Sequence, residues 1–127
     1  MPNYLFDSNA IIYSAAPATA NDALREMLAA PLPAGAASAM SMVEVLGFGR
    51  LTPRDREVLE ATFEALEILP ITDRIISAAI DLGRLYGLKA ADAIIAASAL
   101  ADNRVLVSAD THFKRVPDLV VLNPLAT

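Results

Sequence analysis

Residues 89–101 read KAADAIIAASALA, and this segment decides the fold of the chain. Its residue types favour helix, and Leu, Ile and Ala occupy every face, with Asp92 and Ser98 as polar exceptions after Lys89. A helix that is apolar all round has no side for solvent, so we expect it to lie in the centre of the protein. Asp92 is then expected to be buried, where an isolated carboxylate is costly unless a cation, a proton or hydrogen-bond donors compensate for it.

The composition predicts one domain, spanning residues 1–127, with a large core. Hydrophobic residues make up 55% of the 127 and charged residues 20%, which excludes a disordered chain. We expect a cytoplasmic protein without membrane contact, because no signal-peptide pattern and no apolar span of about 18 residues is visible. The absence of cysteine excludes disulfides, a thiolate nucleophile and cysteine zinc sites.

The net charge of −5 argues against an extended cationic surface that binds long nucleic acids. It does not exclude a focused site, where a divalent ion reverses the local sign of the charge. Candidate phosphate contacts are Arg25, Lys114 and Arg115, although such side chains are most often solvated surface.

Short strands alternate with helices along the chain. Strands are expected at 3–6, 68–71, 104–108 and 119–122, with room for another within 35–40, and helices at 10–14, 21–30, 41–50, 53–67, 74–86 and 89–101. This alternation predicts an α/β fold in three layers, a mostly parallel sheet of four or five strands with helices on both faces. The β-branched run 104–108 suits a central strand, whereas Pro70 places 68–71 at an edge or a strand end.

Two helices carry more specific expectations. Ser41 and Glu44 have the spacing of a capping box, in which Glu44 bonds back to the backbone at Ser41; alternatively, the apolar neighbours of Glu44 indicate that it points into a pocket. In the helix 74–86 the residues expected to pack inward are Ile75, Ile76, Ala79, Ile80 and Leu82.

Four carboxylates fall where such a sheet binds ligands. Asp7 follows the first expected strand and Asp110 follows 104–108, and ligands of open parallel sheets bind beyond the carboxyl ends of the strands. The first turns of the helices that carry Glu44 and Asp92 reach the same rim. We therefore expect all four to converge, although Asp7 and the two residues after it are also good helix N-cap residues.

Converging carboxylates indicate a particular chemistry. They cannot all stay ionised at close range without a cation. Oxygen ligands select hard ions, Mg²⁺ or, as a substitute, Mn²⁺. Such ions activate water and hold a phosphodiester for in-line attack, so the predicted reaction is hydrolysis of a phosphate ester.

Four motifs together resemble a known family. Residues 7–9 (DSN), 41–44 (SxxE), 91–97 (ADAxIAA) and 108–113 (SxDxxF) are similar to those of the PIN domain, in particular the VapC-type toxin of bacterial toxin–antitoxin pairs. The resemblance runs from Asn3 to Pro124. It implies a PIN-like fold and a Mg²⁺-dependent endoribonuclease that cleaves RNA, is usually a homodimer and is held inactive by a cognate antitoxin covering the acidic site.

The resemblance also implies roles for individual residues. Asp7 and Asp92 would be the main metal ligands, and Glu44 and Asp110 would complete the pocket directly or through waters, so that these four are the candidate catalytic residues. Ser108 and Asn9 would hydrogen-bond around them. His112 stands where many relatives have another acid; we expect an exposed loop histidine there rather than a phosphate contact.

Other functions fit less well. A haloacid-dehalogenase-like phosphatase needs a second Asp where Asn9 stands, and a histidine-driven ribonuclease needs a general acid and a general base, whereas His112 is the sole histidine. A receiver domain would have its phosphorylated Asp after the third strand, which does not match. The remaining rival is a PIN fold kept as a catalytically silent module that binds RNA or protein; the intact set of four acids argues against it.

Overall fold

The computed structural model describes residues 3–15 and 35–124. The helix expected at 21–30, together with Arg25, lies outside the described residues. The elements in chain order are β1 (Tyr4–Phe6), α1 (Ser8–Ala15), β2 (Gly35–Ser38), α3 (Ala39–Leu46), α4 (Pro53–Glu64), β3 (Glu67–Leu69), α5 (Asp73–Tyr86), α6 (Ala90–Ala101), β4 (Val105–Val107), the 3-10 helix η1 (Thr111–Arg115) and β5 (Val121–Leu122).

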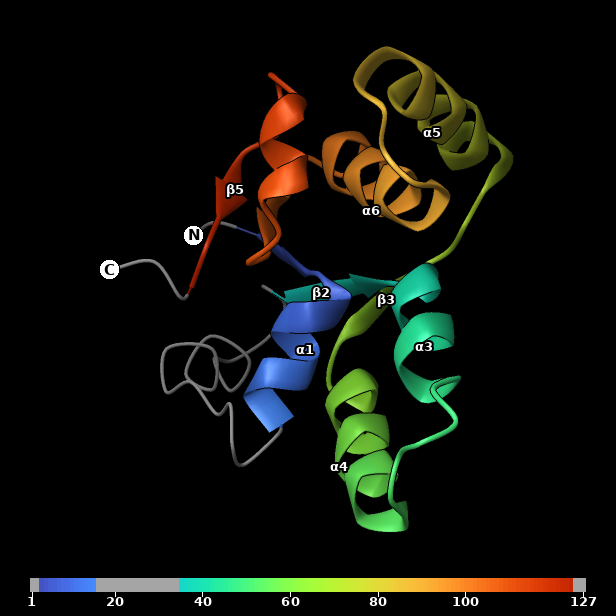
Figure 1. Ribbon diagram of the computed structural model, residues 1–127, viewed down its shortest axis with the longest axis vertical. Helices are drawn as coiled ribbons and strands as arrows, with labels where there is room; N and C mark the ends of the chain where they lie inside the picture. The colour runs from blue at the N-terminus through green and yellow to red at the C-terminus, as the bar shows by residue number, and fades with distance from the viewer. Residues whose placement is uncertain (1–2, 16–34, 125–127) are drawn as a thin grey trace.

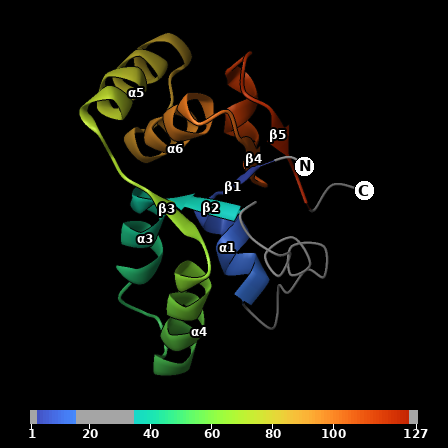
Figure 2. The ribbon, with the colours of Figure 1, turned by 180° about the vertical axis from the view of Figure 1, so that it is seen from behind.

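The strands form one parallel sheet in the order β3-β2-β1-β4-β5. Leu5 of β1 is in register with Ala36 on one side and Leu106 on the other. Helices cover both faces, with α1, α3 and α4 on one and α5 and α6 on the other, as Figures 1 and 2 show. The α/β prediction is confirmed, and β3, which Pro70 follows, is an edge strand as expected.

Successive residues of each strand supply two separate cores, because strand side chains alternate between the faces of a sheet. Leu5, Ala36 and Leu106 pack against α5, α6 and η1. Their chain neighbours Phe6, Ala37 and Val107 pack against α1, α3 and α4. The short strands are apolar on both faces for this reason, as expected of a covered parallel sheet.

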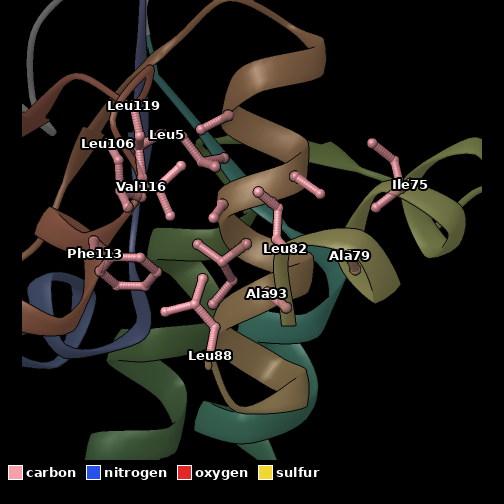
Figure 3. Packing of buried hydrophobic residues seen from close by; sticks show 14 of the residues in the cluster. Leu5, Ile75, Ala79, Leu82, Leu88, Ala93, Leu106, Phe113, Val116 and Leu119 are labelled. Carbon is pink, nitrogen blue, oxygen red and sulfur yellow. The ribbon is translucent and has the colours of Figure 1, made fainter. Parts of the chain in front are cut away.

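Helix α6 is the central element of the first core (Figure 3). Its residues 95–99 are buried, and Leu88 and Phe113 belong to the same cluster. The expectation that α6 has no solvent side is wrong at its ends, however, since Ala90 and Leu100 are exposed and Asp92 is half-buried. Asp92 lies in the first turn, so the helix begins at the rim of the core and enters it afterwards.

The prediction of a capping box at Ser41 is wrong, because the helix begins about one turn earlier in the chain. Helix α3 begins at Ala39, and the cap is Ser38, whose side chain accepts a hydrogen bond from the Met40 backbone N–H at 3.1 Å. Ser41 is therefore inside the helix and buried, and Glu44 is exposed. A serine at the end of β2 takes the role because α3 follows the strand without a connecting loop.

Helix α5 also differs from expectation on one face. Ile75, Ala79 and Leu82 are buried as predicted, but Ile76 is 44% exposed and Ile80 55% exposed. Thr72 caps the helix and Gly87 ends it with a φ of 68°, both as expected. No helix of the described part of the chain has the length and apolarity needed to cross a membrane.

Candidate active site

Asp7 is held at the carboxyl end of the sheet. Its backbone N–H donates to the Val107 carbonyl at 3.0 Å, which places the ends of β1 and β4 side by side. The Ser108 hydroxyl donates to Asp7 Oδ2 at 2.7 Å and the Ser8 backbone N–H donates to Asp7 Oδ1 at 2.8 Å. Both carboxylate oxygens of a 5% exposed side chain therefore have a donor.

These donors do not offset the burial of Asp7. Burial raises the pKa of its carboxyl to about 6, against the lowering effect of the bonds from Ser108 and Ser8. The charges of Asp92 and Glu44 raise this pKa further. Asp7 is thus a carboxyl that protein groups alone do not keep fully ionised at neutral pH.

Glu44 reaches the same region from α3. Its Oε1 accepts a 2.9 Å hydrogen bond from the Ser8 hydroxyl, so that Ser8 contacts Asp7 through its backbone and Glu44 through its side chain. Of the two interpretations of Glu44, the one that points it toward a pocket is supported by this bond. Its carboxylate stays exposed to solvent, unlike that of Asp7.

Asp92, Asp110 and His112 form the tightest group of potential ligands among the described residues. One ligand atom from each lies within 4.8 Å of the others. Asp110 Oδ1 accepts from the His112 backbone at 2.8 Å and lies 3.1 Å from His112 Nδ1. The pKa of Asp92 is raised by burial and by the charges of Asp110 and Glu44, while His112 and Lys89 lower it.

Ser108 joins the two parts of the site. Its hydroxyl oxygen accepts from the Asp110 backbone N–H at 3.0 Å while the hydroxyl donates to Asp7. The prediction that Ser108 hydrogen-bonds around the acids agrees with this geometry. Asn9 Oδ1 is buried and has no hydrogen-bond partner among the described residues, so the matching expectation for Asn9 stays a prediction.

The structure thus brings together the four acids that the sequence singled out, from four elements or their ends. Asp7 feels the charges of Asp92 and Glu44, and Asp92 feels those of Asp110 and Glu44. Sequence reasoning gave His112 too little weight: the side chain is exposed as expected, yet it is a neighbour of both aspartates. The sequence could have indicated this contact, because His112 lies two residues after Asp110. The first turn of η1, which Asp110 caps, brings the two side chains together.

The donor set fits a hard divalent cation. Asp92 and Asp110 offer carboxylate oxygens within 4.8 Å of each other, a separation that an ion with bonds of about 2.0–2.6 Å to its ligands spans, and His112 offers a nitrogen within the same distance. Burial first, and neighbouring acids second, raise the pKa values of Asp7 and Asp92, and a divalent ion would favour their charged forms against both effects. The unpartnered Asn9 oxygen lies two residues beyond Asp7 and adds a neutral acceptor to this part of the chain.

Three cavities adjoin the acids. An apolar groove of about 320 Å³ between α1, α3 and α4 is lined by Glu44 and by the exposed side chains of Ile12, Phe48 and Val58. Lys114 lines a cavity of about 280 Å³ with Ser108 and Asp110. A smaller cavity of about 140 Å³ is lined by Gly87, Leu88, Lys89, Asp92, His112 and Arg115.

Comparison with known proteins gives a consistent assignment. The PIN domain family model matches residues 4–119. Similar solved structures include a toxin–antitoxin complex from Klebsiella pneumoniae (24% identity, TM-score 0.78, covering 96% of this chain and 98% of that one) and FitAcB from Neisseria gonorrhoeae (23%, 0.79, 95% and 97%). DNA-bound VapBC from Salmonella typhimurium is 19% identical, with a TM-score of 0.80 and coverage of 98% and 99%. No curated protein matches the chain closely enough to count as a relative.

Proposed function

Because the chain belongs to the PIN domain family, we propose that it is a metal-dependent endoribonuclease, the toxin of a type II toxin–antitoxin pair. The observation that carries this proposal is the convergence of Asp7, Glu44, Asp92 and Asp110 at the carboxyl edge of a parallel sheet. The similarity to toxin–antitoxin structures over nearly the whole length of both chains supports it.

The acids would hold Mg²⁺, or Mn²⁺ as a substitute. Asp7, Asp92 and Asp110 are the proposed ligands, with Glu44 binding directly or through a water. When bound, the ion supplies a positive charge for the phosphodiester and lowers the pKa of a water molecule. His112 would orient the Asp110 carboxylate, whose Oδ1 lies 3.1 Å from its Nδ1, at a position where many relatives have another acid.

The remaining steps fall to side chains of the chain itself. Ser108 fixes Asp7 relative to Asp110, since it bonds to the carboxylate of one and the backbone of the other. Ser8 orients Glu44 in the same way. Glu44 is the most exposed of the four acids, so it is the one placed to accept a proton from an attacking water.

The test is cleavage of a mixed single-stranded RNA by purified protein with and without Mg²⁺. We expect Asp92→Asn to abolish cleavage, and Glu44→Gln, which can keep the bond from Ser8, to lower it by about 10- to 100-fold. Asp118→Asn, in the turn before β5, serves as an equivalent control. Cleavage that survives a chelator, or that Asp92→Asn retains, would refute the proposal. Metal-independent RNA binding without cleavage would favour the silent binding module.

We also propose that an antitoxin segment occupies the apolar groove between α1, α3 and α4. The groove exposes Ile12, Phe48 and Val58 and is also lined by the acids Glu44 and Asp55, so a segment with apolar side chains and a basic residue would fill it and neutralise Glu44. Coexpression of the toxin with the reading frame immediately upstream should restore growth. Phe48→Glu should weaken that rescue, whereas Leu85→Glu, a change on α5, should not.

The second proposed partner is another copy of the chain, docked through α5. Asp73, Ile76, Ile80 and Arg84 follow one another at helical spacing along one face of α5. An antiparallel twofold pairing centred near Ala78 sets Ile76 against Ile80 of the other copy and Asp73 against its Arg84. The exposed isoleucines would thus be covered and the charges at both ends paired.

Sedimentation tests this dimer. Ile80→Glu should give monomers, while Leu85→Glu should leave the dimer intact because Leu85 is on another side of α5. The single change Asp73→Arg should weaken association by bringing two arginines together. Adding Arg84→Asp should restore it, because the pairing is then reversed at both ends. Failure of this rescue would exclude the antiparallel register.

A further inference from the structure

Both lysines of this acidic chain lie beside its acidic site. Lys89 and Lys114, together with Arg115 and the single histidine, are in the two short segments beside Asp92 and Asp110. Arg56 and Arg104 are in ion pairs with acids, whereas Lys89 and Arg115, like Arg50, Arg54, Arg74 and Arg84, form no ion pair with any described residue. A protein with a net charge of −5 thus keeps unpaired cations next to its acidic site.

Two of these cationic side chains and the histidine share one small cavity. Lys89, His112 and Arg115 line a space of about 140 Å³, together with Asp92 and the turn at Gly87 and Leu88. Pockets that hold small-molecule ligands measure about 300–1,000 Å³, so this one suits a single charged group. The cavity has two cations, Lys89 and Arg115, an imidazole that can donate a hydrogen bond, and one acid, Asp92, which also faces the proposed metal centre.

The walls of this cavity are fixed by the core. Leu88, next to Lys89, and Phe113, next to His112, are buried in the same hydrophobic cluster, which Figure 3 shows from close by. Arg115 Nη1 donates to the Gly87 carbonyl at 3.4 Å, which ties the guanidinium to the turn between α5 and α6. The backbone beside Lys89 and His112 and the guanidinium of Arg115 are therefore held at the rim before any ligand arrives, which reduces the entropy that binding must remove.

From this geometry we propose that the cavity lined by Lys89, His112 and Arg115 binds a phosphate of the RNA backbone next to the phosphate that is cleaved. The proposal rests on the proposed nuclease function and adds where the strand is held. Each nucleotide linkage carries one negative charge, so a second phosphate would meet the cationic cavity while its neighbour lies at the acids. Lys89 and Arg115 would thus be binding residues that position the strand and leave the chemistry to the acids.

Steady-state cleavage of a short RNA tests the proposal, with KM and kcat measured as a function of salt. We expect Lys89→Gln and Arg115→Gln each to raise KM by about 5-fold, to leave kcat nearly unchanged and to reduce the salt dependence by about one ion. Arg74→Gln, at the opposite end of α5, is the control for the same loss of charge. An equal effect of Arg74→Gln, or a loss confined to kcat, would overturn the proposal.

A chemical change in the RNA locates the contact. A single neutral methylphosphonate on one side of the cleaved bond should raise KM for the wild-type protein, and the same RNA should show no added penalty with the Lys89→Gln/Arg115→Gln protein. Equal penalties in both proteins would overturn the assignment. Arg115→Lys, which keeps the charge, should bind nearly normally, and this separates phosphate binding from the bond to Gly87.

Failure of the nuclease proposal would be seen separately. If the wild-type protein cleaves no RNA with Mg²⁺, the cavity is tested by fluorescence anisotropy with a labelled single-stranded RNA in chelator. Weaker binding by Lys89→Gln and Arg115→Gln, with Arg74→Gln unchanged, would support the phosphate site without cleavage. No difference among the three would overturn it.

Discussion

The Ser108 hydroxyl donates a 2.7 Å hydrogen bond to Asp7 Oδ2, although the two residues are 101 positions apart. The bond joins the ends of β1 and β4, and it connects Asp7 to the backbone of Asp110 through the same oxygen. It is also the contact that does most to lower the pKa of Asp7 against the effect of burial.

Replacing Ser108 by alanine should therefore affect stability and activity together. Asp7 and the Asp110 N–H each lose a partner, which should cost about 1–3 kcal/mol of unfolding free energy at neutral pH. The pKa of Asp7 should rise, so the ascending limb of the pH–rate profile should move to higher pH. Ser98→Ala is the control, because the buried Ser98 hydroxyl donates a 2.8 Å hydrogen bond to the Ile94 carbonyl within its own helix α6. Equal losses in both variants would contradict the role given to Ser108.

Asp7→Asn should make the metal-free protein more stable at neutral pH. The folded-state pKa of about 6 exceeds the ordinary value of 3.8, so wild-type stability should fall as the pH rises from about 4 to about 6 and level off above 7. The variant should lack this fall and gain up to about 3 kcal/mol at pH 7.5, but nothing below pH 4. Urea unfolding in chelator at several pH values checks this. A variant that is less stable at every pH would show that the bonds from Ser8 and Ser108 outweigh the burial of charge.

Divalent ions should offset the destabilising effect of the charged acids on the folded protein. An ion that binds the folded acids alone should stabilise the wild-type protein by about 2.7 kcal/mol at a concentration 100-fold above its Kd. Thermal unfolding with Mg²⁺ or Mn²⁺ should show the increase, and Asp92→Asn should remove most of it. Asp118→Asn should behave like wild type. An equal shift in all three proteins would indicate nonspecific ion binding.

Arg104 offers a test of stability without activity. Its side chain is 7% exposed and donates to the Tyr4 carbonyl at 3.3 Å and to Glu67 Oε2 at 2.6 Å, and it pairs with Asp102. It precedes β4, at the opposite end of the sheet from the acids. Arg104→Met should lower the unfolding free energy by about 1–3 kcal/mol and leave kcat of the folded protein unchanged. A selective loss of kcat would show coupling between the two ends of the sheet.

Much of the fold follows from local sequence. The caps Thr52 and Thr72, the end of α5 at Gly87 and the apolar run of β4 depend on neighbours within a turn, so they were predictable. The start of α3 was not, because Ser38 and Ser41 are both good cap residues and the end of β2 decides between them. The exposure of Ile76 and Ile80 was not predicted for a similar reason. Periodicity identifies the apolar face of α5, but it does not tell how much of that face α6 covers.

The sequence by itself determined the α/β alternation and the helix 89–101 and singled out the four acids as candidates, because periodicity and residue chemistry are local properties. Only the tertiary structure decided their distances. It buried Asp7 almost fully while leaving Asp92 half-buried, and it turned His112 toward Asp110. These outcomes depend on the register of β1 and β4 and on the packing of α6 and η1 against them, which brings together residues about a hundred positions apart.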